Sequence, residues 1–595
     1  MTTAAPRSIS VARSEARVLG VLLCAWLVPW ALLSVAAWVA GGRPSASPWT
    51  FVNPARIAAH YRADGDAVVL WHLVETRREP NQQCFWAMLA LTLIAPAAAA
   101  GLHALRPARA PRAAARRLLG RMAPNRTSRW ARWSDLGHLR VRRARSGAFI
   151  LGRRHRALIA TEAETSVLVV GPTRSGKTSG IVIPNLFEWL GPAIVTSTKS
   201  ELVDITGAHR QSIGPVYVYD PTGEIGERYR SVTWSPINGC DDLDHAWRVA
   251  SWLCAGLQQG NTKGDNDWAH WAESGKLLIA PLLYVAARTD RSIVDVCEWI
   301  HRFDLDTPVS ALEDFVLDES GGQRTDCERA LSMLLAVDQR PDKERGTVFS
   351  TVMRIFGVFN ENAVARSALT SRFNADEFLK RRGTLYLCTP RQSPERVASL
   401  FVGILMTVVT AAYGIAGRMP LGRLQTELGL FLDELANVVP IEDLPALASQ
   451  GAGRGVVLMS IVQDLSQLRT RYGADRANSI LNNHGCKVIL PGISDPETAD
   501  VVARMIGRTN LTDVQVNRAA DGSSSRSYTV RQEQLATPDM LRQLHDGSAI
   551  VLHRGSPPLM VHVHPWFRDR RCRKRARRRF LSNADYAGAR ISDTL

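Results

Sequence analysis

Residues 167–178 of the chain read VLVVGPTRSGKT. A short apolar run, typical of a buried strand, leads directly into Gly-x-x-x-x-Gly-Lys-Thr, and SGIVI (179–183) after it is compatible with a helix. This pattern is a phosphate-binding loop in its required context, with a strand before it and a helix after it. Glycine at positions 171 and 176 permits backbone angles and close approaches that a side chain would block. The stretch therefore predicts nucleotide binding within an α/β fold.

The loop is expected to hold phosphate through its backbone and through two side chains. Its amide groups and the helix N-terminus form a cradle for phosphate oxygens. Lys177 is expected to reach the β- and γ-phosphates, and the hydroxyl of Thr178 to hold Mg²⁺. The residues assigned to nucleotide binding are Gly171, Pro172, Thr173, Arg174, Ser175, Gly176, Lys177 and Thr178.

Length and composition indicate several modules in a reducing compartment. The 595 residues are too many for one compact domain, and 46% apolar residues suffice for a large core. Nine cysteines are scattered with no Cys-x-x-Cys and no zinc-ligand spacing, so buried free thiols are expected. His562 and His564 share one face of a predicted strand, but no further ligands lie nearby and a metal site there is not expected.

Two apolar stretches near the N-terminus predict membrane spans. Residues 18–40 carry no charge and are long enough to cross a bilayer, and residues 84–105 form a second, Ala-rich span. Residues 106–147 are saturated with Arg, which places them in the cytoplasm by the positive-inside rule. Residues 1–17 then form a cytoplasmic leader and residues 41–83 an external loop, so both ends are expected inside.

The formal charge of +17 is concentrated in two segments. Residues 105–156 hold sixteen Arg against one acid, and residues 568–579 hold nine basic residues against one acid. The first segment fits either membrane topology with attraction to anionic headgroups or a nucleic-acid contact beside the membrane. The second reads as a solvated basic tail of low order over residues 568–595.

The remaining chain alternates between strands and helices. Strands are expected at 149–152, 167–170, 193–198, 216–221, 384–388, 428–432, 456–462, 487–490 and 548–552. Residues 224–382 read as helices, so one α/β nucleotide-binding domain (148–223 and 383–567) is interrupted by an all-helical insertion. Residues 398–417 are apolar enough to span a membrane, but a span would separate the loop from residues needed at the same nucleotide, so a buried helix is predicted.

Two strand ends supply further candidate residues. The strand at 428–432 is followed by Asp433 and Glu434, the expected form of a Walker B motif. Asp433 would hold Mg²⁺, and Glu434 would orient and polarise the attacking water. Gln463 follows the strand at 456–462, in the crevice where ligands of parallel sheets bind, and could contact the γ-phosphate or be an ordinary surface residue.

Several motifs together resemble the TraG-like coupling ATPases of conjugation and type IV secretion. They are GPTRSGKT (171–178), VTSTKSEL (195–202), VYVYDPTG (216–223), FLDELANV (431–438) and QDLSQL (463–468), with the two N-terminal spans. The resemblance implies an inner-membrane-anchored, RecA-like, ATP- and Mg²⁺-dependent motor, active as a hexamer. It also implies delivery of a DNA substrate, expected to be single-stranded and bound to a relaxase, to the proteins of a secretion channel.

The family roles map onto Lys177, Thr178, Asp433, Glu434 and Gln463. One departure is that residues 197–201 read STKSE where many relatives have Asp-Pro-Lys-Gly-Glu. The alternatives are an ATPase that secretes only proteins, an FtsK-type DNA translocase and a membrane-anchored nucleotide-binding scaffold. Two spans instead of four count against the second alternative, and the two hydrolytic carboxylates count against the third.

Arg454 is the candidate for a residue that completes catalysis between subunits. It stands in QGAGRG (450–455), just before the strand that ends at Gln463, and its glycine neighbours leave the side chain room to project. A RecA-like motor leaves one side of the γ-phosphate open to a neighbour's arginine. The alternative is that Arg454 is a turn residue with no special role.

Overall fold

The computed structural model describes residues 127–197, 200–225, 229, 231–256, 265–388, 394–518 and 524–578, and two short strands, β1 (Arg43–Pro44) and β2 (Val74–Glu75). The chain divides into two compact units, Met1–Arg126 and Thr127–Leu595. In the first unit, β1 and β2 pair antiparallel, with Arg43 opposite Glu75. The predicted leader and both predicted spans lie outside the described residues.

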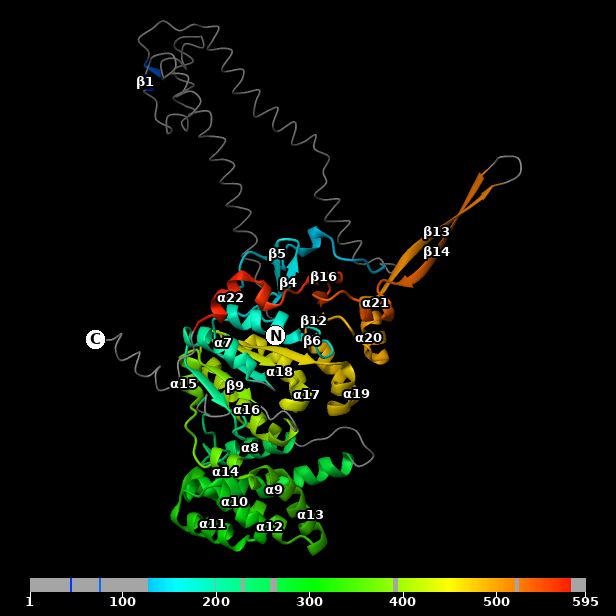
Figure 1. The fold of residues 1–595 in the computed structure, drawn as a ribbon. Coiled ribbons are helices and arrows are strands. Elements are labelled where there is room, and N and C mark those ends of the chain that lie inside the picture. The colour runs from blue at the N-terminus through cyan, green and yellow to red at the C-terminus, as the bar shows by residue number, and fades with distance from the viewer. Residues whose placement is uncertain are drawn as a thin grey trace, which may run out of the picture. The chain divides into compact units, whose positions relative to one another are not determined.

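The second unit is built on one mixed sheet, which has twelve strands among the described residues (Figure 1). Seven neighbours run parallel, in the order β12 (Cys486–Ile489), β6 (Val167–Val170), β11 (Val456–Val462), β10 (Leu428–Leu432), β7 (Ala193–Ser197), β9 (Thr384–Cys388) and β8 (Val216–Tyr219). Beyond β12 the sheet continues antiparallel through β15 (Ser548–His553), β16 (Leu559–His562), β4 (Ile150–Arg154), β5 (Ala157–Ala160) and β3 (Arg140–Val141).

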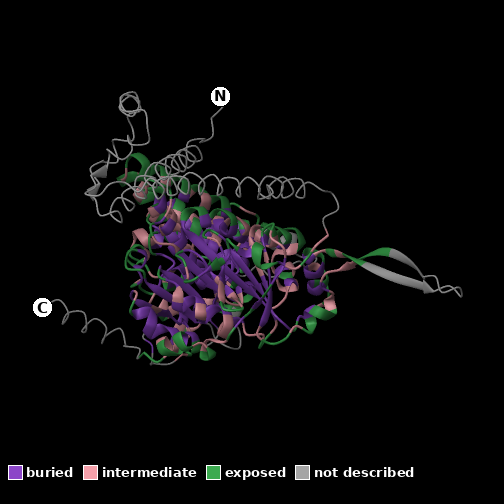
Figure 2. Cartoon of the chain, turned by 90° about the horizontal axis from the view of Figure 1, so that it is seen from above, coloured by how far each residue is buried: buried purple, intermediate pink, exposed green. Residues whose placement is uncertain are grey.

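Helices cover both faces of the parallel strands, which explains why those strands are apolar along their whole length. In β6, Val167 and Val169 pack into one core, whereas Leu168 and Val170 pack into the other. The first core includes the π-helix η3 (Lys177–Val182), α6 (Ile183–Glu188) and α7 (Glu201–Gln211). The second includes α17 (Leu435–Val438), α18 (Leu444–Gln450), α19 (Leu465–Asn483), α20 (Pro496–Ile506) and α21 (Pro538–Arg542). Figure 2 shows the sheet as a buried interior.

The predicted strands are confirmed, with small differences at their ends, and the strand predicted around His562 is β16, whereas β3 and β5 were not predicted. Between β8 and β9 the described residues form helices and no strand. These are α8 (Leu243–Ala255), α9 (Asp265–Arg288), α10 (Ile293–Arg302), α11 (Asp306–Asp318), α12 (Gly321–Asp338), α13 (Asp342–Phe356), α14 (Asn362–Ser367) and α15 (Ala375–Lys380). Residues 278–286 of α9 are almost wholly enclosed, because α8, α12 and α13 pack around this helix.

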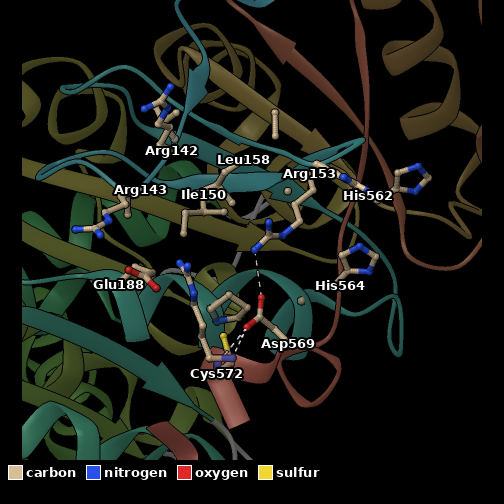
Figure 3. Close-up of a pocket in the computed structure, with 18 of the residues that line it drawn as sticks. Arg142, Arg143, Ile150, Arg153, Leu158, Glu188, His562, His564, Asp569 and Cys572 are labelled. Atoms are coloured by element: carbon tan, nitrogen blue, oxygen red, sulfur yellow. Dashed lines mark hydrogen bonds and ion pairs between the residues drawn. The ribbon is translucent and has the colours of Figure 1, made fainter. Parts of the chain in front are cut away.

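The predicted solvated tail is wrong for its first part. Residues 570–576 form α22 (Arg570–Ala576), which packs against α6 and α7 (Figure 3). Asp569 caps the helix by accepting from the backbone N–H groups of Arg571 and Cys572, and the Cys572 side chain is buried. Nη1 of Arg575 donates to Glu188 at 2.5 Å and to the carbonyl of Phe187 at 2.8 Å. The cap at Asp569, the buried side chain of Cys572 and the pairing of Arg575 with Glu188 thus order a stretch whose sequence is a run of basic residues.

The predicted Arg-rich linker over residues 106–147 also extends too far. From Thr127 onward it belongs to the second unit. The backbone N–H of Ala131 donates to the carbonyl of Pro558 at 2.8 Å. The short helix η2 (Trp133–Leu136) and β3 follow, and β3 pairs with β5. Backbone pairing is available to any sequence, so composition alone did not reveal this.

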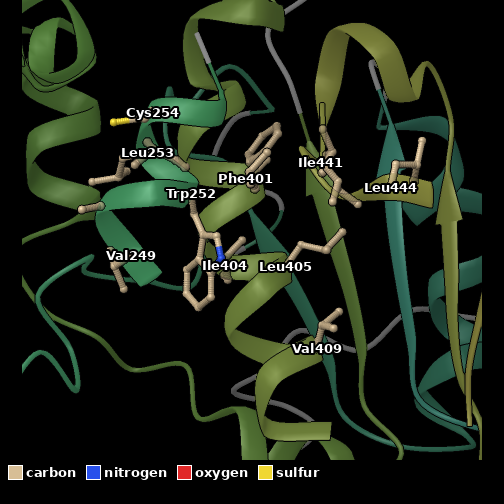
Figure 4. Close-up of a cluster of buried hydrophobic side chains, with 14 of the residues drawn as sticks. Val249, Trp252, Leu253, Cys254, Phe401, Ile404, Leu405, Val409, Ile441 and Leu444 are labelled. Carbon is tan, nitrogen blue, oxygen red and sulfur yellow. The ribbon is translucent and has the colours of Figure 1, made fainter. Parts of the chain in front are cut away.

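The apolar stretch at 398–417 forms a core helix, as predicted. Among the described residues, one helix, Glu395–Gly417, is long and apolar enough to cross a membrane by length and composition. Its regular part, α16 (Ala398–Gly417), runs between the parallel strands β9 and β10 of the same sheet. Phe401, Ile404 and Leu405 are buried beside Trp252 and Leu253 of α8 (Figure 4). A crossover between strands of one sheet cannot also cross a bilayer, because both strands must lie on one side.

One feature of the fold was not predicted. Strands β13 (Arg508–Arg518) and β14 (Ser524–Gln534) pair antiparallel over eleven residues each and project from the body of the unit (Figures 1 and 2). The hairpin follows α20 directly, and Arg508 pairs with Gln534 at its base.

Candidate functional site

The phosphate-binding loop follows β6 at the carboxyl edge of the parallel strands. A Cβ at Gly171 would lie 2.7 Å from Cβ of Leu490 and 2.7 Å from Oγ of Ser175, so no side chain fits there. Gly176 has φ +90°, in the left-handed region that favours glycine. The two glycines of the motif are therefore needed for different reasons, one for close approach and the other for its backbone conformation.

Lys177 lies inside the loop. Its Nζ donates to the carbonyls of Gly171 and Pro172, both at 2.7 Å, and the side chain is almost fully buried. Burial lowers the pKa of Lys177, while the negative charges of Asp433 and Glu434 oppose that shift. The ammonium thus stands among loop carbonyls that a phosphate oxygen could replace, with two carboxylates close enough to influence its charge.

Thr178 and Asp433 meet at this loop although 255 positions separate them. Oγ1 of Thr178 donates to Oδ2 of Asp433 at 3.0 Å. Two neighbouring ligands of an octahedral Mg²⁺, each about 2.0–2.1 Å from the ion, stand about 2.9 Å apart. The hydroxyl and the carboxylate therefore fit two adjacent positions of a magnesium ion, both with the oxygen ligands that Mg²⁺ prefers.

Glu434 directly follows Asp433 and is half-buried. Its φ of 53° lies in the left-handed region, which non-glycine residues seldom adopt. Strained backbone of this kind persists where the surrounding structure imposes it, and it is common at functional sites. The residue also caps α17, so the chain turns from β10 into a helix at the position predicted to orient water.

Gln463 lies beside the loop as well. Strand β11 stands between β6 and β10 in the sheet, and Val462 is paired with Val170. The N–H of Gly171 donates to the carbonyl of Val462 at 3.1 Å. Gln463, the next residue after Val462, therefore lies beside the first residue of the loop. The structure thus brings together the loop, Asp433, Glu434 and Gln463 at the ends of three adjacent strands.

Arg454 is not brought to the site. It ends the short helix η6 (Ala452–Arg454) before β11, at the amino end of this strand, whereas the loop lies at the carboxyl end. The seven residues of β11 span roughly 20 Å. The side chain is exposed, and its Cζ lies 4.6 Å from the centroid of the Tyr413 ring. Within one chain, Arg454 and Lys177 are on opposite edges of the sheet.

Sequence reasoning missed Thr196 as a site residue. This buried residue of β7 donates from Oγ1 to the backbone carbonyl of Asp433 at 2.7 Å. Thr196 belongs to the stretch 195–202 that resembles the family. The sequence therefore pointed to this stretch, but it did not show that Thr196 contacts Asp433. Ser197 stands where many relatives have Asp, and it is buried at the end of β7, whereas Thr198 and Lys199 of the same stretch lie outside the described residues.

Comparisons with known proteins agree on one family. The family model described as "Type IV secretory system Conjugative DNA transfer" matches residues 129–587. The conjugal transfer protein TraG of Escherichia coli is 25% identical over 397 residues, which cover 63% of this chain and 60% of TraG. The protein VirD4 of Agrobacterium fabrum (strain C58 / ATCC 33970) is 25% identical over 467 residues, covering 75% of this chain and 66% of VirD4. The chain thus spans about two thirds or less of these relatives.

Solved structures of TrwB, a bacterial conjugative coupling protein, share the fold. The form in complex with sulphate has a TM-score of 0.55 at 17% identity and covers 74% of this chain and 95% of its own. The complex with ADP and Mg²⁺ has a TM-score of 0.54 at 16% identity, with coverages of 74% and 96%. At this identity the likeness shows an α/β nucleotide-binding fold with a large mixed sheet.

Proposed function

The chain belongs to the type IV secretory conjugative DNA transfer family, and on this premise we propose that it is a membrane-anchored ATPase that couples DNA to a type IV secretion channel. The observation that carries the proposal is the 3.0 Å contact between Thr178 and Asp433, with Lys177, Glu434 and Gln463 at the same edge of the sheet. These are the groups that hydrolysis of a nucleoside triphosphate requires.

Each residue has a distinct proposed role. Lys177 binds the β- and γ-phosphates, and Glu434 orients the attacking water and accepts its proton. Thr178 and Asp433 hold Mg²⁺, which supplies positive charge to the phosphate oxygens when bound. Gln463 contacts the γ-phosphate or the water. TrwB structures with the ATP analogue ADPNP, and with ADP and Mg²⁺, support ATP and Mg²⁺ as the ligands.

The proposed assembly is a RecA-like homo-hexamer with the helical insertion at residues 224–382. In it, Arg454 would act on the nucleotide of a neighbouring subunit, since its own site is at the opposite edge of the sheet. The basis is the family resemblance together with the exposure of Arg454. The proposed substrate is single-stranded DNA bound to a relaxase, delivered to secretion-channel proteins.

The proposed location is the cytoplasmic membrane, with two spans and both ends inside. Charge asymmetry around residues 18–40 and 84–105 is the basis. A reporter fused near residue 60 should be external, and reporters after residues 110 and 420 should be internal. An external signal at residue 420 would contradict the position of α16 between two strands of one sheet.

ATP turnover of the purified full-length chain, with and without DNA, tests the function. We expect single-stranded DNA to stimulate turnover, with an effect that falls steeply as salt rises. Turnover that responds to a protein substrate but never to DNA would favour the protein-only alternative. Nucleotide binding without turnover under any condition would favour a scaffold.

A further inference from the structure

A cavity lies beside the helical segment that follows the phosphate-binding loop. Its volume is about 1190 Å³, and its walls come from β3, β4, β5, β16, α6 and α22. The residues that line it come from two segments far apart in sequence, 133–158 and 562–575, and from the helix between them (Figure 3). These are the two segments whose Arg content stands out in the sequence, and the fold brings them together.

The lining is strongly basic. It contains eight arginines and two carboxylates, Asp569 and Glu188. Nη2 of Arg153 lies 3.3 Å from Asp569, and Nη1 of Arg575 lies 2.5 Å from Glu188, so both carboxylates are already paired (Figure 3). The other six arginines have no carboxylate partner among the described residues: Arg140, Arg142, Arg143, Arg156, Arg570 and Arg571.

The positive charges of this lining repel one another unless an anion binds among them. Like charges around one concavity raise the energy of the folded state, and the energy falls when a ligand of opposite charge binds. Guanidinium groups match phosphate oxygens in two-pronged geometry, and six arginines without a carboxylate partner call for more negative charge than a single carboxylate carries. The volume is slightly above the range of small-molecule sites, which is roughly 300–1,000 Å³. We propose that this arginine cavity binds a compact ligand carrying two or more phosphate groups, either a lipid headgroup or a soluble polyphosphate.

A nucleic-acid strand fits this cavity less well than a compact ligand. Single-stranded nucleic acids bind where exposed aromatic faces accept stacked bases along a basic groove. Trp133 is the tryptophan of the lining, and Cζ of Arg140 already covers it at 4.7 Å from the ring centroid. The His155 ring also approaches Trp133 edge-on at 5.8 Å. Trp133 is still 44% exposed, so the lining offers one partly covered indole ring and not a series of tryptophan faces along a groove.

One helical segment connects the cavity to the candidate nucleotide site. Gly180 and Pro184 line it, and they belong to the helical segment that begins with Lys177 and Thr178. This segment packs closely on the residue that follows β16, since a Cβ at Gly180 would lie 2.5 Å from Cγ1 of Val563. A ligand in the cavity would therefore contact the phosphate-binding helix from behind and change ATP turnover. This second effect rests on the proposed ATPase function, whereas binding itself does not.

Binding is tested with the full-length chain in detergent, saturated with an ATP analogue and Mg²⁺ so that the loop is filled. The probe is tripolyphosphate at constant free Mg²⁺. Arg142→Glu with Arg143→Glu should weaken its binding by about tenfold or more. Arg570→Glu with Arg571→Glu, on another element, should do the same. Arg302→Glu with Arg372→Glu, two exposed arginines of the insertion, is the matched control and should bind as the wild type does. Equal affinity in all four proteins would overturn the proposal.

Bilayers then distinguish the source of the phosphate. The chain is reconstituted with a lipid bearing two phosphates or, at equal total charge, a lipid bearing one. A change of turnover that needs the two-phosphate lipid and is lost in Arg142→Glu with Arg143→Glu identifies a headgroup. A response to tripolyphosphate alone identifies a soluble ligand.

If the cavity variants lose binding of short single-stranded DNA but keep that of tripolyphosphate, the site is a nucleic-acid contact and the proposal fails. Cavity binding in a protein without ATP turnover would refute the proposed function and leave the site standing.

Discussion

Oγ1 of Thr196 donates a hydrogen bond to the backbone carbonyl of Asp433 at 2.7 Å. Strands β7 and β10 lie side by side in the sheet, and Thr196 follows the last paired residue, Val195, which is opposite Phe431. The bond fixes the backbone at the point where β10 ends and Asp433, the carboxylate proposed to hold Mg²⁺, begins. The next residue, Glu434, has a left-handed backbone, so this carbonyl is part of a constrained turn.

Thr196→Val keeps the shape of the side chain but removes its donor. A buried carbonyl without its donor costs about 1–3 kcal/mol, and the turn that orients Asp433 and Glu434 is expected to loosen. We expect turnover to fall by about tenfold or more and the Mg²⁺ concentration for half-maximal turnover to rise. Thr196→Ser, which retains the hydroxyl, should restore both values. An unchanged Mg²⁺ requirement in Thr196→Val would show that the bond does not position the carboxylate.

Variants of Lys177 and of Glu434 should lose different steps of the ATPase reaction. Lys177→Ala is expected to lose nucleotide binding or the correct placement of the phosphates. Glu434→Gln should bind ATP with near-normal affinity but lose turnover by about a hundredfold or more, because it lacks the base that orients water. Binding of a fluorescent ATP analogue and release of phosphate separate the two effects. Wild-type turnover in Glu434→Gln would mean that another group does this work.

Arg454 is expected to act between subunits. Arg454→Ala and Lys177→Ala should each be inactive alone, and a mixture should recover activity, since some interfaces pair an intact loop with an intact arginine. Arg454→Ala mixed with wild type serves as the control for assembly. Absence of recovery at every ratio, with mixed oligomers shown by cross-linking, would leave Arg454 as a turn residue held by Tyr413.

The C-terminal helix should stabilise the fold, whereas the residues beyond it should not. A chain ending at Pro565 lacks α22 and its contacts with Glu188 and Phe187. We expect the midpoint of thermal unfolding to fall by about 3 °C or more, with reduced turnover because α6 is held less firmly. A chain ending at Arg579 retains the helix and is the matched control. Equal midpoints for the two truncated chains would show that α22 adds no stability.

Stability should fall in mild acid because of His484. Its Nδ1 lies 2.7 Å from the carbonyl of Ile480 and must donate to it, so Nε2 accepts from Ser460 at 2.9 Å. Burial lowers the pKa of His484 from 6.5 to about 4. Between pH 6.5 and pH 4 the unfolded chain takes up a proton that the folded chain does not, so stability is lost as pH falls, by up to about 3 kcal/mol.

The pH dependence of thermal unfolding measures this loss. His209 and His553 also have pKa values lowered to about 4 by burial, so they contribute in the same direction. His484→Gln cannot be protonated and should unfold at a lower temperature at pH 7 but with a shallower decline toward acid. A decline as steep as that of the wild type would assign the effect to other groups.

Local sequence was sufficient for much of the fold. The glycines and Lys177 predicted the loop because phosphate binding needs backbone access at fixed spacing, which is a local property. The apolar runs predicted the central strands because a parallel sheet is buried on both faces and leaves little choice of residue. The helix at 398–417 was predicted to lie inside the protein for another reason, which is that the residues before and after it had to reach one nucleotide.

Only the tertiary structure decided which distant residues meet. The contact between Thr178 and Asp433 and the bond from Thr196 depend on the order of strands in the sheet, which no local pattern encodes. The basic segment at 570–575 was predicted to be solvated, and the one at 140–156 to lie beside the membrane or to contact nucleic acid. A helix cap at Asp569, buried Cys572 and the pair Arg575–Glu188 instead hold the C-terminal segment against the body of the unit, where both segments line one cavity. Charge content is a property of the chain, whereas the position of each charge is set by backbone pairing and packing between elements far apart in sequence.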